Sequence, residues 1–78
     1  MPYDKLSSLK PGQSAQIRAI HAEEALHQRM LALGFRVGKK IEVIRQARFS
    51  GPVHVRIGTT DVMMRPAEAS HIEIGDIR

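Results

Sequence analysis

The stretch VHVRIGTTDVMM, residues 53–64, decides the fold class of this chain. Its first five residues alternate β-branched and polar side chains, which is the period of a strand with one buried face. Gly58 and the polar residues after it interrupt this alternation as a turn, and Val62 and Met64 then continue one face of another strand. Residues 53–64 therefore predict two short neighbouring strands joined by a tight turn.

A longer strand is predicted immediately before this stretch, over residues 40–49. Its alternation is regular at Ile41 and Val43 and slips at Ile44, which a bulge or a bend would explain. Residues 49–52 contain a glycine and a proline, and we assign them to the connecting turn.

Two more strands and a helical turn are predicted further out in both directions. Residues 13–20 alternate small apolar and polar side chains, and residues 72–74 form a short last strand. Residues 65–70 suit a single helical turn, because Pro66 fits the first position of a helix.

The apolar period changes in residues 23–33, which predict an α-helix. The positions expected to face the core are spaced four and three apart: Leu26, Met30 and Leu33. The positions expected to face solvent are Glu23, Glu24, His27 and Gln28. Gly34 follows as a C-terminal stop, and we expect Phe35 after it to fold back onto Met30.

These elements predict a mainly β protein: a small, partly open β-barrel of about five strands with one inserted helix. The connections are too short for parallel crossovers, except for the segment that contains the helix. A chain of 78 residues has room for one core, so residues 1–78 are expected to form a single domain.

Composition excludes several classes of protein. The chain has no cysteine, so it forms no disulfide, no thiolate zinc site and no cysteine nucleophile. It shows neither a signal-peptide pattern nor a run of about 18 apolar residues, so we expect a cytoplasmic location without direct membrane insertion. The net charge of +4 favours solubility and leaves an acidic partner open.

The sequence offers no catalytic constellation, and we expect no enzyme. No serine lies in a Gly-x-Ser-x-Gly elbow. The segment GFRVGKK, residues 34–40, resembles a phosphate-binding loop only superficially: it has three residues between its glycines instead of four. Lys40 also occupies the position where a phosphate-binding loop has a hydroxyl.

Three residues are candidate metal ligands: His21, Glu24 and His27. Glu24 and His27 are three residues apart and can share a helix face, and His21 could join them from before the helix. Such a set could hold zinc or ferrous iron weakly. A solvated polar face is the favoured interpretation, so we expect that no cofactor is required.

Nucleic-acid binding is the third class considered, because several arginines alternate with apolar residues along the strands. Small barrels that bind single strands use stacking aromatic side chains, and this chain has three aromatic residues. Two of them, Phe35 and Phe49, lie at predicted turns and are interpreted as packing residues. We therefore expect no nucleic-acid partner.

The order of several motifs carries a resemblance to a known family. In chain order these motifs are Leu6-x-x-Leu9-x-x-Gly12, Gln28-Arg29-Met30-Leu31-Ala32-Leu33-Gly34-Phe35, Gly38, Ile41-x-Val43, Gly51-Pro52-Val53, Val62-Met63-Met64-Arg65 and Glu68-Ala69. From Leu6 to Ile74 the chain resembles the FeoA family, the small cytosolic component of bacterial ferrous iron transport. Met30 is a departure, since the family more often has leucine there, and this exchange conserves volume.

The resemblance implies an SH3-like barrel and a regulatory role beside FeoB, a membrane transporter with a GTPase domain. The same fold also accompanies DNA-binding regions in iron-dependent repressors, and no such region is apparent in this chain. The residues that the resemblance and their positions suggest for partner binding are Arg29, Arg36, Lys39, Arg65 and Glu68. We expect Arg29 to be the centre of that surface. Direct iron carriage and nucleic-acid binding remain the alternative functions.

Overall fold

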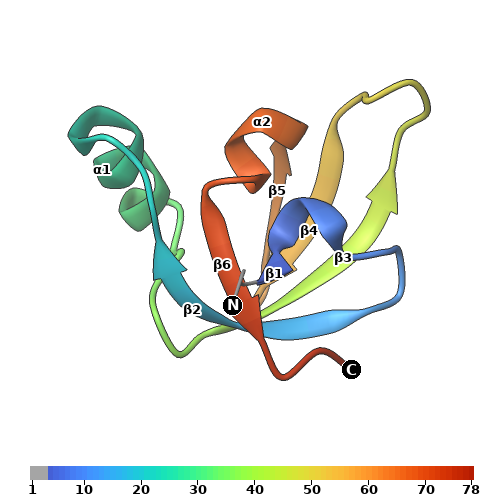
Figure 1. Ribbon diagram of the computed structural model, residues 1–78, viewed down its shortest axis with the longest axis horizontal. Helices are drawn as coiled ribbons and strands as arrows, with labels where there is room; N and C mark the ends of the chain where they lie inside the picture. Colours follow the sequence, from blue (N-terminus) through green and yellow to red (C-terminus); the bar gives the residue numbers. More distant parts are fainter. Residues whose placement is uncertain (1–3) are drawn as a thin grey trace.

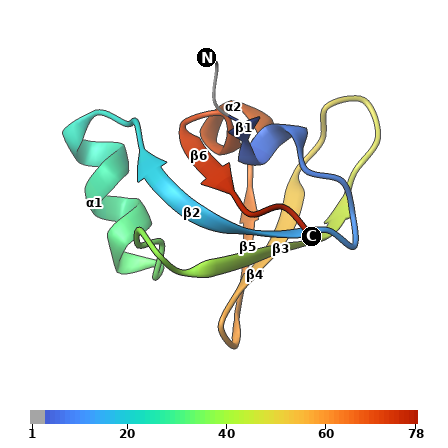
Figure 2. The ribbon, with the colours of Figure 1, turned by 60° about the horizontal axis from the view of Figure 1, so that its bottom comes forward.

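The computed structural model describes residues 4–78, so the first three residues of the predicted domain lie outside the described part. Its strands form one antiparallel sheet in the order β1-β6-β2-β3-β4-β5 (Figure 1). The elements are β1 Asp4–Lys5, the 3₁₀ turn η1 Leu6–Ser8, β2 Ser14–Ile20, α1 Glu24–Ala32, β3 Lys40–Gln46, β4 Val53–Ile57, β5 Thr60–Met64, α2 Pro66–Ala69 and β6 Ile72–Gly75. The sheet is strongly curved and is not closed, because β1 and β5 are its two edges (Figure 2). The predicted mainly β, partly open barrel is confirmed, and β1 is an additional strand.

Two irregularities in pairing bend this sheet. The register of β3 against β4 shifts between Val43 and Arg45, which confirms the predicted slip at Ile44. The register of β2 against β6 shifts between Ile17 and Ala19. After this second shift Ile20 packs against the core, although simple alternation would place it outside.

The core lies on the concave side of the curved sheet and is entirely apolar among the described residues. Its largest fully buried side chains are Phe35, Leu6, Ile17, Ile41 and Ile72. They come from β2, β3, β6, η1 and the segment after α1, so the sheet and its short connections build most of the interior. Within residues 4–78, no helix combines the length and the apolarity that crossing a bilayer requires.

Helix α1 buries less of its apolar stripe than its spacing predicts. Met30 is 2% exposed and Leu26 is partly buried, but Leu33 is 41% exposed, so its assignment to the core is wrong. Leu33 is the C-cap of α1, and the chain turns away from the helix axis directly after it. His27, predicted to face solvent, is half-buried.

The end of α1 has the predicted glycine stop. The Phe35 N–H donates to the Met30 carbonyl and the Gly34 N–H donates to the Leu31 carbonyl, both at 3.0 Å. Gly34 has a φ of 101°, a conformation that side chains with a Cβ adopt at a cost. This turn returns the chain to the sheet and places the fully buried Phe35 in the core, as predicted.

The loop between β3 and β4 differs from its prediction. Its ends are joined by a hydrogen bond from the Ala47 N–H to the Pro52 carbonyl, at 3.0 Å. At its tip Phe49 and Ser50 have φ values of 58° and 60°. The Phe49 side chain is 99% exposed, so its interpretation as a packing residue is wrong. The ordered strand β3 ends at Gln46, and the loop carries Phe49 beyond the reach of the core.

Candidate functional site

An ion pair joins α1 to α2. Arg29 on α1 pairs through Nη2 with the Oε2 atom of Glu68 on α2, 39 residues away in the chain. The second carboxylate oxygen of Glu68 accepts the backbone N–H of Arg65 at 2.9 Å, where α2 begins. The predicted partner-binding residues Arg29, Arg65 and Glu68 are therefore brought together, and the side chain that pairs with Glu68 is Arg29.

Two cavities adjoin this ion pair. The first, of about 390 Å³, is lined by Arg29, Pro52, Met63, Met64, Arg65 and Glu68. The second, of about 150 Å³, separates α1 from β5 and is mainly apolar, with Leu26, Leu33 and Met63 among its lining residues. Met63 borders both cavities and is 62% exposed. The exposed Leu33 thus lines a surface cavity rather than the core.

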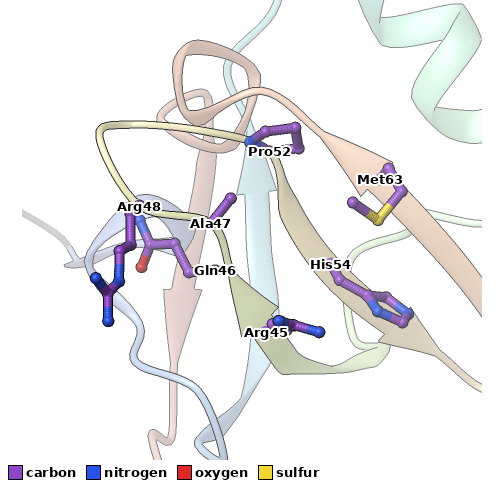
Figure 3. Close-up of a pocket in the computed structure, with 7 residues that line it drawn as sticks. All are labelled: Arg45, Gln46, Ala47, Arg48, Pro52, His54 and Met63. Atoms are coloured by element: carbon purple, nitrogen blue, oxygen red, sulfur yellow. The ribbon is translucent and has the colours of Figure 1, made fainter.

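Met63 also lines a third cavity, of about 580 Å³ (Figure 3). We call it the hairpin groove, and it is lined by Arg45, Gln46, Ala47, Arg48, Pro52, His54 and Met63. Met63 belongs to the motif Val62-Met63-Met64-Arg65, but it is not among the residues that the sequence suggests for partner binding. The available signal was its position: the period of β5 turns Met63 outward, and the Met63 side chain joins Leu33 in lining an apolar surface cavity.

A polar cluster holds one wall of the hairpin groove. The Arg56 guanidinium donates to both carboxylate oxygens of Asp61, at 2.7 and 3.2 Å. The Nε2 atom of His54 lies 3.0 Å from Oδ2 of Asp61, in contact but without the alignment of a hydrogen bond. The bonds from Arg56, followed by the approach of His54, lower the pKa of Asp61 to about 2. Asp61 is thus an anion in contact with His54, and the strand register places His54 opposite Met63.

The remaining predicted residues of the partner surface lie elsewhere. Arg36 and Lys39 are exposed residues of the loop between α1 and β3. Neither of them lines the three cavities around Met63. The expected extension of the Arg29 surface toward them is therefore not seen in the cavities, which extend toward the β3–β4 loop instead.

The candidate metal ligands do not form a cluster. The Nε2 atom of His21 lies 2.8 Å from Oε1 of Glu73 on β6, whereas Glu24 and His27 belong to α1. Within residues 4–78, no three His, Asp or Glu side chains are grouped closely enough to hold a metal ion. The side chains that line the cavities around Met63 are arginines, His54, the carboxylate of Glu68 and several apolar residues.

An open, strongly curved antiparallel sheet of this kind defines a small, partly open β-barrel domain. Residues 5–75 match the FeoA domain model, and the chain belongs to the FeoA domain family. FeoA proteins are small accessory proteins of Fe(2+) transport and are not a known enzyme family. The predicted family is therefore confirmed.

Three relatives define this similarity. The chain is 33% identical over 69 residues to a putative Fe(2+) transport protein A of Campylobacter jejuni, covering 88% of this chain and 93% of that one. It is 34% identical over 70 residues to an Fe(2+) transport protein A/Fe(2+) transporter FeoB fusion protein of Porphyromonas gingivalis. That match covers 90% of this chain and only 8% of the fusion protein.

The third relative is a solved structure, FeoA of Stenotrophomonas maltophilia complexed with zinc, a prokaryotic SH3 domain protein. It superposes with a TM-score of 0.85 at 25% identity, over 96% of this chain and 95% of that one. The expected SH3-like fold is confirmed.

Proposed function

We propose that this chain is a small cytosolic accessory protein of ferrous iron uptake that binds the GTPase-containing cytosolic part of a FeoB-type transporter and modulates it. The observation that carries the proposal is the Porphyromonas gingivalis protein, in which a domain 34% identical to this chain is fused to an Fe(2+) transporter FeoB. Fusion holds two domains at a high effective concentration, which is an advantage for domains that act on each other.

The surface around Arg29 has the composition of a binding surface. Arginine and methionine are enriched at protein interfaces, and here Arg29 and Arg65 flank the exposed Met63. The Arg29 side chain is 64% exposed although it pairs with Glu68. Its guanidinium has five donors, so it can hold Glu68 and still donate to a carboxylate of the partner.

A matched pair of charge reversals tests the proposal. Arg29 and Arg18 are both exposed arginines with one carboxylate partner, since Arg18 pairs with Asp76 at 2.8 Å. Arg29→Glu and Arg18→Glu therefore change the net charge equally and each break one surface ion pair. Their effects on stability should both be small, about 1 kcal/mol or less.

Titration calorimetry against the cytosolic part of the transporter gives the measurement. We expect the wild-type chain to bind, Arg29→Glu to weaken binding about tenfold or more, and Arg18→Glu to change it less than about twofold. A folded wild-type chain that does not bind would refute the proposal, and equal losses in both variants would refute the role of Arg29. Uptake of Fe(2+) by vesicles containing the transporter, with and without the chain, tests the modulation.

A further inference from the structure

Among the described residues, three arginines that line the cavities bordered by Met63 have no carboxylate partner. Within residues 4–78, the arginines that form ion pairs with carboxylates are Arg18, Arg29 and Arg56. Arg45 and Arg48 line the hairpin groove, and Arg65 lines the neighbouring cavity, without such a pair. Arginine charge without a carboxylate partner therefore lies in both of these cavities, which favours an anionic group from outside the chain.

The register of three strands explains how the groove is built. Arg45 on β3 is the cross-strand partner of His54 on β4, and His54 is the partner of Met63 on β5. Directly paired residues point to the same face of a sheet, so these side chains form one row across it. In Figure 3, Arg45 reaches toward His54, and the Arg48 side chain extends away from Met63. Arg45 is thus the guanidinium best placed to meet a ligand in the groove.

The loop at the end of the groove displays a second binding element. Phe49 is 99% exposed at a tip whose residues have left-handed backbone conformations. An exposed aromatic side chain supplies a large contact area with only two rotatable bonds, and buried aromatic anchors dominate many interfaces. The hydrogen bond between the Ala47 N–H and the Pro52 carbonyl holds this tip in place.

We propose that the hairpin groove binds an acidic protein segment: one of its carboxylates pairs with Arg45, and an apolar residue beside it packs on Met63 and Pro52. Phe49 inserts into the surface of the same partner. The inference rests on the proposed function, and it assigns the segment to the cytosolic part of the transporter. A concave groove of about 580 Å³ favours a protruding protein segment over a lipid surface, which would touch Phe49 and leave the groove unfilled.

Peptides that tile the cytosolic part of the transporter test the inference. Their binding to the wild-type chain is measured by fluorescence anisotropy, beside binding of the whole cytosolic part. We expect the bound peptide to carry at least two carboxylates next to a large apolar residue. Arg45→Glu should weaken its binding about tenfold or more, and Phe49→Ser about threefold to fivefold. Arg18→Glu is the control, because Arg18 is an exposed arginine outside the groove, and it should change binding less than about twofold.

The outcomes separate the two proposals. If the whole cytosolic part binds and only Arg29→Glu weakens it, the groove is not the docking surface and the proposed function stands. If the cytosolic part does not bind the folded wild-type chain, the proposed function fails and the inference fails with it. The chain could instead bind vesicles of anionic phospholipid in an Arg45-dependent way and bind none of the peptides. That result would overturn the inference and identify a lipid surface as the ligand of the groove.

Discussion

The curved sheet and helix α1 are anchored in different ways. In the sheet, alternate residues of the central strands are buried, and Ile41, Val43 and Val55 are fully so. Among the nine residues of α1, Met30 alone is buried. The helix is held by Met30, by the turn that leads to Phe35, and by the ion pair between Arg29 and Glu68.

This difference separates stability from binding. Buried apolar area stabilises the sheet, whereas an exposed ion pair such as Arg29–Glu68 contributes little to stability. The outer side of α1 and the β3–β4 loop can therefore change with little effect on folding. These are the regions that border the cavities around Met63.

The largest expected difference in stability between the two regions is that between substitutions of the two phenylalanines. Phe35 is fully buried and Phe49 is 99% exposed. Phe35→Ala should lower the free energy of unfolding by about 3–5 kcal/mol, a large part of the total for a small domain. Phe49→Ala should change it by less than about 0.5 kcal/mol. Urea unfolding followed by circular dichroism measures both, and comparable losses would show that the loop tip also carries stability.

The sequence predicted the central strands well for a physical reason. Alternation of apolar and polar residues shows which side of a strand is buried, and in β4 this alternation continues over the whole strand. The bulge near Ile44 was also visible, because an extra residue shifts the alternation. Strand β1 was missed because two exposed residues carry no periodic signal.

Leu33 and Phe49 are two residues whose burial the sequence pattern does not predict correctly. Helical spacing places Leu33 beside Met30, but spacing does not reveal that Met30 is the last residue of α1 to reach the core. Phe49 is an apolar residue at a turn, and only the path of the loop decides whether it packs. Both residues are hydrophobic and exposed, so hydrophobicity alone does not predict burial at the end of a helix or at a loop tip.

The candidate surface depends on contacts between distant parts of the chain. The Arg29 to Glu68 ion pair spans 39 residues, and no local pattern specifies it. The hairpin groove depends on the registers that align Arg45, His54 and Met63 across three strands. The resemblance to FeoA supplied Arg29, Arg65 and Glu68, but their proximity is a property of the fold.

Gly34 connects the two regions, and its conformation gives the second prediction. A Cβ added at Gly34 would meet no atom within 4 Å, so the cost of a side chain arises from its φ of 101° alone. Gly34→Ala should lower the free energy of unfolding by about 1 kcal/mol. Gly34→Asn should lower it by less, because asparagine adopts left-handed conformations more readily. Hydrogen exchange should locate the change at the Gly34 and Phe35 amides, and equal losses for both variants would argue against a conformational cause.

The smallest expected effect concerns the polar cluster on the sheet surface. Asp61 has its pKa lowered from 3.8 to about 2, chiefly by the hydrogen bonds from Arg56. A carboxyl group whose pKa is lower in the folded chain stabilises the fold above its unfolded pKa, and this contribution disappears as the pH falls from about 4 toward 2. In Asp61→Asn this contribution is missing, so the urea midpoint should fall less steeply between pH 4 and pH 2 than in the wild type. The Asp61 side chain is 43% exposed, so 1 M salt should reduce the difference between the two proteins. Identical pH profiles at low salt would mean that the pair with Arg56 does not stabilise the sheet.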